Sequence, residues 1–316
     1  MRHLLWRHLP TLYRRLQKPG TCPQEFSIGI AIGDSPFALK LPDWLKNPVL
    51  TRRSVTDVPA VMVADPFMCR DEDQRCWYLF FEVVNHINGR GEIGLAVSND
   101  AMVWEYQRIV LAAPFHLSYP YVFHWEDTYY MIPESTRSGG VTLYRADNFP
   151  DRWVPVANLL EGKRYVDSSI LRHDDKWWLF TDAGTDLAHP VLRLYFADRL
   201  EGPWREHPSS PIRKDDPHFT RPSGRLIVVD GMPIRFAQDV YPVYGATVSA
   251  FGITKLTPTE YEERPVGDGP ILSAGSERWN SHGMHHVDAH RRPDGSWIAC
   301  VDGFILGKRR AQNVRQ

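Results

Sequence analysis

The sequence lacks several features that define common functional classes. It contains no run of 18 apolar residues, so it shows no transmembrane helix. The formal net charge is −1 over 316 residues, and bulk charge therefore does not favour a nucleic acid or an anionic membrane as partner. Arg7, His8 and Pro10 interrupt the N-terminal segment, which excludes the apolar stretch of a secretory signal. We therefore expect a cytoplasmic protein with no transmembrane segment and no nucleic-acid partner.

Cysteine is also scarce, with four residues in the whole chain and no metal-ligand spacing among them. Cys69 and Cys76 are separated by six residues across an expected turn, where paired strands would bring the two thiols near each other. So few cysteines in a chain of this size are more typical of reduced thiols than of a disulfide framework. Four histidines fall on one expected strand and its turn, where they do not converge like a helical zinc pair: His282, His285, His286 and His290. The sequence thus predicts no metal ligands.

A short aromatic and aliphatic run that ends on a carboxylate recurs about every 50 residues. The copies are 77–82, 129–134, 177–182, 297–302 and a fainter 234–239. Self-similar, strand-like units with this period are typical of a propeller with one repeat per blade. No helical pattern longer than two turns interrupts residues 60–305, which excludes a parallel α/β fold. The sequence therefore predicts an all-β, five-bladed β-propeller.

The remaining segments predict how the propeller begins and closes. Residues 26–33 form a strand-like run ahead of the first repeat, and we expect it to complete the last blade and remove its free edge. Residues 1–18 place five leucines opposite arginines at helical spacing, which predicts a short basic amphipathic helix. That helix would pack on the propeller or on a partner, or lie on a membrane surface. We expect an N-terminal extension over residues 1–20 and one domain over residues 21–316.

The first strand of each blade lines the central channel of a propeller, and its first residues surround one opening, here called the mouth. Alignment of the repeats on the closing acid places five polar residues there: Asp65, Tyr119, Asp167, Arg221 and His286. Ionised groups gathered in this way cost desolvation energy unless they are paired. This arrangement is better explained as a functional site than as a stabilising feature.

The closing carboxylates form a second ring, which consists of Glu82, Glu134, Asp182, Asp239 and Asp302. Each either accepts backbone N–H groups from the next turn or points toward the channel. Glu134 directly follows Pro133, and a bend at that proline would aim the Glu134 carboxylate inward. Gln238 and Asp288 lie near the same ring and complete the set of candidate substrate-binding residues.

Two segments of the chain, 63–67 and 166–169, resemble the aspartate-bearing turns of glycoside hydrolase family 43, whose members are five-bladed propellers. A closer similarity is to the family-43-like domain at the N-terminus of plant glucosamine inositolphosphorylceramide transferases and to free-standing bacterial relatives. The pieces that carry this similarity are 29–36, 47–50, 57–65, 116–120, 132–135, 202–204 and 283–288. The resemblance implies that Asp65 is a general base and Asp167 a residue that tunes a neighbouring pKa. The family's general acid belongs near the start of blade 4, where this chain has Arg221.

The resemblance and the ring of acids together predict a glycosidase that acts on a carbohydrate or glycoconjugate. Glycosidic cleavage needs a proton donor and a carboxylate that activates water or attacks the sugar. We expect Asp65 to be the base, Glu134 (or otherwise Glu82) the acid, and Asp167 the group that raises the pKa of the acid. The alternatives are a glycan-binding propeller without catalysis and an accessory to glycosyl transfer. The chain has no nucleotide-binding motif, which argues against its performing the transfer itself.

The remaining polar and aromatic candidates would bind the substrate. Arg221 and His286 would hold hydroxyls or a carboxylate, and Tyr119 and Trp125 would stack on sugar rings. The full set of predicted substrate-binding residues is Glu82, Tyr119, Trp125, Asp182, Arg221, Gln238, His286 and Asp288. No cofactor is expected from the residues, although the resemblance implies a possible channel cation such as calcium, with His286 nearest. The sequence leaves the oligomeric state open.

Overall fold

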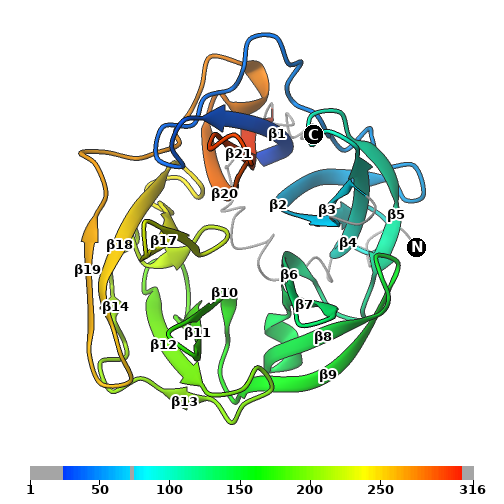
Figure 1. Cartoon of the computed structure of the whole chain (residues 1–316). Coiled ribbons are helices and arrows are strands. Elements are labelled where there is room, and N and C mark those ends of the chain that lie inside the picture. The colour runs from blue at the N-terminus through cyan, green and yellow to red at the C-terminus, as the bar shows by residue number, and fades with distance from the viewer. Residues whose placement is uncertain (1–23, 72–74, 308–316) are drawn as a thin grey trace, which may run out of the picture.

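The computed structural model describes residues 24–71 and 75–307, which fold into five antiparallel sheets around a central axis (Figure 1). Blade 1 contains β2 (Ala60–Asp71), β3 (Cys76–Asn85), β4 (Arg90–Ser98) and β5 (Glu105–Leu111). Blade 2 contains β6 (Ser118–Trp125), β7 (Thr128–Glu134), β8 (Gly140–Asn148) and β9 (Arg152–Glu161). The predicted five-bladed all-β fold is confirmed.

The other three blades vary this plan. Blade 3 contains β10 (Val166–His173), β11 (Lys176–Asp182), β12 (Val191–Ala197), β13 (Arg205–Glu206) and β14 (Arg213–Lys214). Blade 4 contains β15 (Arg221–Pro222), β16 (Ile227–Val229), β17 (Met232–Gln238), β18 (Val248–Leu256) and β19 (Tyr261–Pro265). Blade 5 contains β20 (Gly283–Arg291), β21 (Trp297–Leu306) and β1 (Gln24–Gly33).

The aromatic side chains of the repeats fill the wedges between neighbouring sheets. Phe80 of blade 1 contacts Trp153 of blade 2 edge-on, with ring centroids 5.5 Å apart. Phe123 of blade 2 lies 5.8 Å from Trp177 of blade 3. Because each sheet is covered on both faces by its neighbours, the middle strands are continuous apolar runs rather than alternating ones. Much of the aromatic content therefore serves the core.

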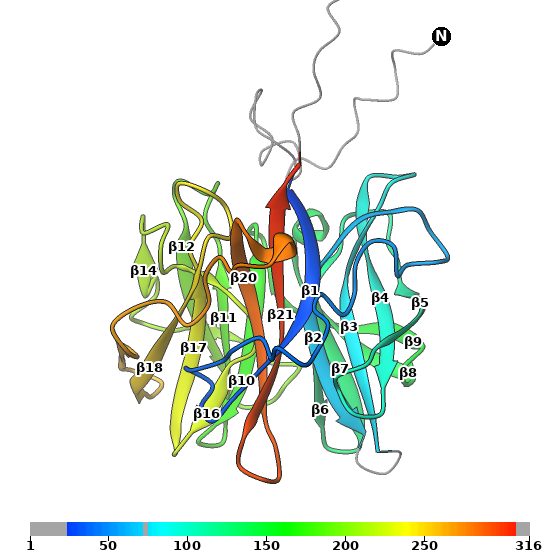
Figure 2. The same ribbon diagram turned by 90° about the horizontal axis from the view of Figure 1, so that it is seen from above.

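The propeller closes through β1, as the sequence predicts. β1 pairs with β21 over ten residues, from Gln24 opposite Leu306 to Gly33 opposite Trp297 (Figure 2). The outer edge of β1 is covered in turn, because the Asn47 side chain accepts a hydrogen bond from Ile30 N–H (2.8 Å) and donates one to Ile30 C=O (3.1 Å). One amide side chain thus replaces a rung of the missing fourth strand and protects an edge that would otherwise be open to pairing.

Blade 4 departs from the predicted continuous first strand. β15 ends after two residues, and Gly224 turns toward the axis with φ of +103° to bridge Val287 of β20. A Cβ atom at Gly224 would lie 1.8 Å from the Val287 carbonyl oxygen, so only glycine fits this crossing. The sheet resumes with β16.

The helical elements of the described residues are two single 3₁₀ turns, η1 (Thr136–Ser138) and η2 (Arg278–Asn280). The predicted N-terminal helix over residues 1–18 lies outside the described residues. No helix in residues 24–71 or 75–307 is long and apolar enough to cross a membrane. Cys69, Cys76 and Cys300 carry free thiols, and the register pairs Cys69 with Tyr78 and Cys76 with Asp71.

Candidate functional site at the mouth of the propeller

A β-bulge at the start of the first strand positions the polar residues of blades 1 to 3. The pairing register shifts just after the residue that is paired with the closing acid, and the bulged residue has a left-handed backbone with φ of about 50°. These residues are Asp65 (φ 51°), Tyr119 (φ 47°) and Asp167 (φ 50°). Such a backbone is rare outside glycine and costs conformational energy. The same strained feature in three blades turns these strands at the mouth, where bulges commonly re-aim side chains.

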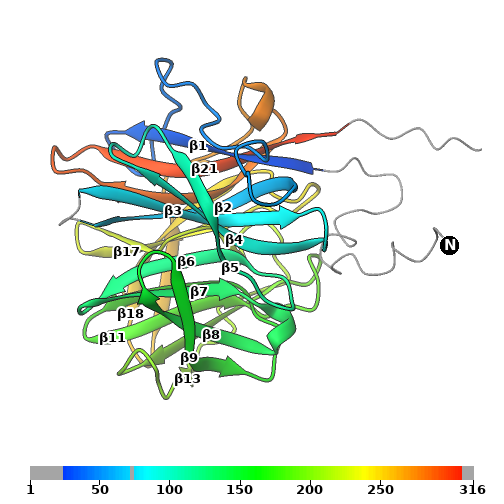
Figure 3. The same cartoon turned by 90° about the vertical axis from the view of Figure 1, so that its right-hand side faces the viewer.

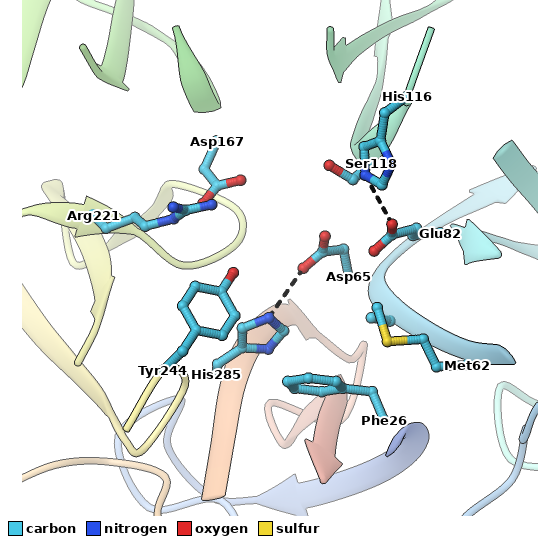
Figure 4. Close-up of a pocket in the computed structure, with 11 residues that line it drawn as sticks. Phe26, Met62, Asp65, Glu82, His116, Ser118, Asp167, Arg221, Tyr244 and His285 are labelled. Atoms are coloured by element: carbon cyan, nitrogen blue, oxygen red, sulfur yellow. Dashed lines mark hydrogen bonds and ion pairs between the residues drawn. The ribbon is translucent and has the colours of Figure 1, made fainter. Parts of the chain in front are cut away.

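The bulged strands surround a hollow at the mouth, which measures about 460 Å³ with its opening to solvent included. Figure 4 shows side chains from all five blades around this space. The hollow is lined by Phe26, Met62, Ala64, Asp65, Glu82, His116, Ser118, Asp167, Arg221, Tyr244 and His285. The structure therefore brings four predicted site residues together in one place: Asp65, Glu82, Asp167 and Arg221.

Arg221 of blade 4 lies beside two acids from other blades. Its Nε donates a hydrogen bond of 2.5 Å to Asp167 Oδ2, and its Nη2 lies 3.8 Å from Glu134 Oε2. Gln238 Nε2 donates to the same Asp167 oxygen at 3.0 Å. The guanidinium also lies over the Tyr244 ring, with 5.3 Å between Cζ and the centroid. Arg221 is only 2% exposed, so this is a buried charge held by opposite charges, as burial requires.

Three polar atoms of this cluster lack a hydrogen-bond partner among the described residues. They are Nη1 of Arg221, Oε2 of Glu134 and Oε1 of Gln238, and all three side chains are buried. Burial, followed by the charge of Asp167, raises the pKa of Glu134 well above its usual value, although Arg221 opposes this. Buried polar groups are normally satisfied, and an unsatisfied guanidinium beside a protonated acid indicates a place where a ligand supplies the missing bonds.

Asp65, His285 and Asp302 form a hydrogen-bonded chain at the blade 1 and blade 5 side. Nδ1 of His285 lies 2.6 Å from Asp302 Oδ1, and its Nε2 lies 3.6 Å from Asp65 Oδ1. Asp302 also accepts the backbone N–H of Asp65 at 2.9 Å. Burial raises the pKa of Asp65 well above its usual value, and the charge of Glu82 adds to this. Burial alone would raise the pKa of Asp302, but the charge and hydrogen bond of His285 outweigh it and lower that pKa.

Glu82 has its own histidine partner. Nε2 of His116 lies 3.0 Å from Glu82 Oε1, and Gly91 N–H donates to Nδ1 of His116 at 2.8 Å. Since Nδ1 accepts, the proton of the neutral ring sits on Nε2 and faces the carboxylate. A Cβ at Gly91 would lie 2.7 Å from Glu82 Oε1, so the glycine permits this close approach. Glu82 is thus oriented by a histidine that also lines the hollow.

The two predicted stacking residues lie away from the hollow. Tyr119 is fully buried, and its hydroxyl accepts a hydrogen bond of 2.5 Å from Gly224 N–H and lies 2.8 Å from Ser169 Oγ. Trp125 ends β6, seven residues beyond Ser118, which corresponds to roughly 23 Å along a strand. There it packs against Trp177 and Arg172. The structure thus places the Tyr119 ring along the axis and the Trp125 ring near the opposite face.

Three other predicted binding residues make structural contacts. Asp182 Oδ1 accepts the N–H groups of Gly184 (2.8 Å) and Val191 (2.9 Å), which is the backbone role that the sequence left open for this ring. Asp288 binds Arg225 at 2.5 Å and Met68 N–H at 2.6 Å, deeper in the channel. Gln238 lies behind Asp167 as a hydrogen-bond donor rather than in the lining.

His286 was predicted at the mouth, but its neighbour His285 lines the hollow instead. In blade 5 the register shift falls between Met284 and His286, before the residue that is paired with the closing acid, whereas in blades 1 to 3 it falls after that residue. His286 is therefore paired with Asp302 and buried between Phe67 and Tyr119. Burial lowers the pKa of His286 to about 4, so the ring is neutral near pH 7.

Asp65, His285 and Asp302 are also the three side chains among the described residues whose ligand atoms lie within 4.8 Å of one another. Two carboxylates and an imidazole suit a small divalent ion in principle. In the structure, however, Asp302 already binds both His285 and the backbone of Asp65. Those hydrogen bonds account for the cluster without an ion, and a channel cation stays a prediction.

Seven lining residues were not among the predicted site residues: Phe26, Met62, Ala64, His116, Ser118, Tyr244 and His285. Ala64, Ser118 and His285 each stand next to a predicted position, so a search that allowed for a bulge would have included them, whereas His116 lies three residues before Tyr119. Tyr244 belongs to the loop between β17 and β18, where no sequence pattern fixes the direction of a side chain. Phe26 and Met62 are indistinguishable from core residues by type.

Solved structures of similar architecture act on glycosidic bonds. The chain superposes on the β-1,2-mannobiose phosphorylase of Listeria innocua with a TM-score of 0.63 and 12% identity, covering 86% of this chain and 96% of that one. It also resembles the exo-β-1,3-galactanase of Clostridium thermocellum, with a TM-score of 0.57 and 14% identity over 68% and 51% of the two chains. At such identity the likeness shows a shared fold.

Sequence comparisons give a closer relationship. The chain is 36% identical over 300 residues to glucosamine inositolphosphorylceramide transferase 1 of Oryza sativa subsp. japonica, covering 88% of this chain and 40% of that protein. The protein of the same name from Arabidopsis thaliana is 34% identical over 298 residues, with coverage of 88% and 39%. The chain thus spans about two fifths of these relatives. Residues 22–304 match the family model described as glucosamine inositolphosphorylceramide transferase 1, N-terminal, and the chain belongs to that family.

Proposed function

We propose that the hollow binds a terminal sugar residue of a glycan or glycoconjugate, and that the propeller is a recognition module that assists glycosyl transfer. The single observation behind this is the buried pair of unpartnered atoms, Nη1 of Arg221 and Oε2 of Glu134. A donor and an acceptor on one buried ion pair suit sugar hydroxyls, which both donate and accept; Arg221 lines the hollow, and Glu134 contacts Arg221 from outside the lining. The hollow is small, because its volume of about 460 Å³ includes the opening to solvent, so it suits one ring at most rather than a chain.

The relatives support an accessory role. The rice and Arabidopsis proteins are named as transferases that act on inositolphosphorylceramide, and this chain corresponds to about 40% of their length. A glycosylated inositolphosphate headgroup is therefore the substrate class we assign to the hollow. In this proposal the propeller holds the acceptor glycoconjugate, while a separate catalytic domain or protein performs the transfer.

Hydrolysis is the second candidate, because the fold is shared with glycosidases and acids line the hollow. The raised pKa of Glu134 suits a general acid, which must be protonated at the working pH. The base must instead be ionised, yet burial also raises the pKa of Asp65. Two acids that both favour the protonated form suit hydrogen bonding to a neutral sugar better than water activation near pH 7.

One experiment separates the two candidates. Calorimetric titration of the protein with a panel of monosaccharides, disaccharides and inositolphosphate glycans measures binding, while chromatography of the same samples measures cleavage. We expect binding without cleavage, and up to about a tenfold loss of affinity in Glu134→Gln, since one hydrogen bond between neutral groups is worth about 1 kcal/mol. Asp65→Asn would retain most of the affinity. Cleavage that disappears in Asp65→Asn would establish the glycosidase instead, and binding of no glycan would refute both.

A further inference from the structure

We infer that Tyr244 determines the specificity of the hollow, so that the hollow admits the terminal residue of a glycan and rejects a sugar that carries a second substituent. This inference rests on the proposed function, since Tyr244 belongs to the same binding site. Tyr244 lies in the loop 239–247, which connects β17 and β18. Among the described lining residues, it is the one that comes from a loop within a blade.

The loop 239–247 is long, but hydrogen bonds across its base fix its shape. The corresponding loops of blades 1 to 3 are shorter: 86–89, 135–139 and 183–190. The N–H groups of Gly245 and Ala246 both donate to the carbonyl of Asp239 at 3.0 Å. The Asp239 carboxylate in turn accepts the N–H of Tyr241 at 2.9 Å. The loop therefore presents Tyr244 in a defined position.

Contacts with blade 5 hold this loop over the mouth. Gln24 Nε2 donates a hydrogen bond of 2.8 Å to the carbonyl of Tyr244. Gln24 begins β1 opposite Leu306, and Figures 2 and 3 show these two strand ends side by side at one face of the molecule. Gly245 has φ of +77°, and a Cβ atom there would lie 2.9 Å from Cβ of His285. Glycine thus lets the loop pass close to the lining of the hollow.

The Tyr244 ring closes the side of the hollow between blades 4 and 5. The ring centroid lies 5.3 Å from Cζ of Arg221 and 5.3 Å from the ring centroid of His285. Figure 4 shows the Tyr244 hydroxyl directed into the hollow. The hydroxyls of Tyr119 and Tyr121 donate to backbone carbonyls, whereas that of Tyr244 has no hydrogen-bond partner among the described residues. Burial raises the pKa of Tyr244 well above its usual value, so the hydroxyl stays protonated and can both donate and accept.

A closed side decides which part of a glycan can enter. A terminal sugar has one glycosidic bond, which can leave through the opening to solvent. An internal sugar has a second bond, and that bond needs an exit through the lining. Tyr244 fills the exit between Arg221 and His285, and such steric exclusion is a common way to reject a competing ligand. Removal of the ring would open this side and convert the pocket into a cleft.

Calorimetric titration with small substituted sugars tests this inference. The probes are the methyl glycosides of glucose, galactose, mannose and glucosamine, each compared with derivatives that carry one additional O-methyl group in place of a second glycosidic bond. Tyr244→Ala removes the ring, and Tyr244→Phe removes the hydroxyl while it keeps the packing on Arg221 and His285. The matched control is Tyr241→Ala, since Tyr241 lies in the same loop, is 61% exposed and is outside the lining.

We expect the wild type to bind the O-methyl derivatives at least about tenfold more weakly than the parent glycoside. Tyr244→Ala should bring at least one rejected derivative within about threefold of its parent, because the ring no longer occupies the space. Tyr244→Phe should keep the rejection and bind the parent about fivefold more weakly, since one hydrogen bond is lost. Tyr241→Ala should bind like the wild type.

Two results would overturn the role of Tyr244 and leave the proposed function intact. One is a Tyr244→Ala variant that rejects every derivative the wild type rejects. The other is a Tyr244→Phe variant that binds the parent glycoside like the wild type, a measurement that does not depend on the stability of Tyr244→Ala. Wild-type protein that binds none of the probes would instead refute the proposed function, and this inference with it.

Discussion

Arg221 Nε lies 2.5 Å from Asp167 Oδ2, although the two residues come from different blades and are both almost fully buried. In the family-43 pattern an acid is expected where Arg221 stands, and here a cation occupies that place. Arg221 brings a fixed positive charge to a hollow whose lining also contains the carboxylates of Asp65, Glu82 and Asp167. It therefore decides which protonation states its neighbours adopt, and it is the first target for mutation.

Replacement of Arg221 by Gln should strongly destabilise the protein, by about 3–5 kcal/mol, because Asp167 would be left buried without a counter-charge. Urea unfolding at neutral pH measures this loss. The double variant Arg221→Gln, Asp167→Asn should recover most of the stability, since it buries no charge. A double variant as unstable as the single one would show that packing, not charge, explains the effect.

Asp65→Asn should stabilise the protein at alkaline pH. Folding raises the pKa of Asp65, so the folded state holds a proton that the unfolded state releases, and stability falls as pH rises from about 4 through the raised value. Asn removes this loss, which amounts to about 1.4 kcal/mol per unit of pKa. Thermal unfolding between about pH 4 and pH 8 measures the difference, which should vanish at the acidic end.

Asp302→Asn is the control, because folding lowers the pKa of Asp302 whereas it raises the pKa of Asp65. The contribution of Asp302 to stability is present above the ordinary carboxyl pKa and is lost as pH falls. Asp302→Asn should therefore be less stable than the wild type near pH 7, with a smaller deficit at low pH. Equal pH profiles for the two variants would contradict the assigned protonation states.

Asn47→Ala should loosen the closing blade. Ile30 N–H and C=O would both lose their partner, at a cost of about 1–3 kcal/mol in the free energy of unfolding. Hydrogen exchange at the Ile30 amide should accelerate more than exchange elsewhere in β1. Asn158→Ala is the control, because Asn158 makes exposed side-chain contacts and should leave stability within about 0.5 kcal/mol.

Tyr119→Phe tests the position of a predicted stacking residue. The variant leaves Gly224 N–H without its acceptor, so we expect a loss of about 1–3 kcal/mol in stability with sugar affinity unchanged. Trp125→Ala should likewise leave affinity unchanged, because Trp125 lies at the other end of β6. Loss of affinity without loss of stability in Tyr119→Phe would restore the stacking role.

Much of the site could be located from the sequence because propeller geometry is regular. Alignment on the closing acids was enough to bring Asp65, Asp167 and Arg221 to one opening, since the first strands all begin there. The same count chose His286 over His285, because in blade 5 the bulge precedes the residue paired with the closing acid, which reverses which side chain faces the hollow. Trp125 was predicted as a stacking residue from its aromatic ring, but it stands at the other end of a strand of eight residues.

The sequence by itself determined the number of blades and the closure by β1, because each repeat carries the apolar runs that make a strand and cannot bury them without neighbours. Tertiary structure alone decided which polar groups are paired and which are free. Arg221 binds Asp167 yet keeps one nitrogen unpartnered, and Asp302 is hydrogen-bonded to His285. Those partners lie more than 15 residues apart in the chain, and their meeting depends on bulges and blade angles that no local pattern encodes.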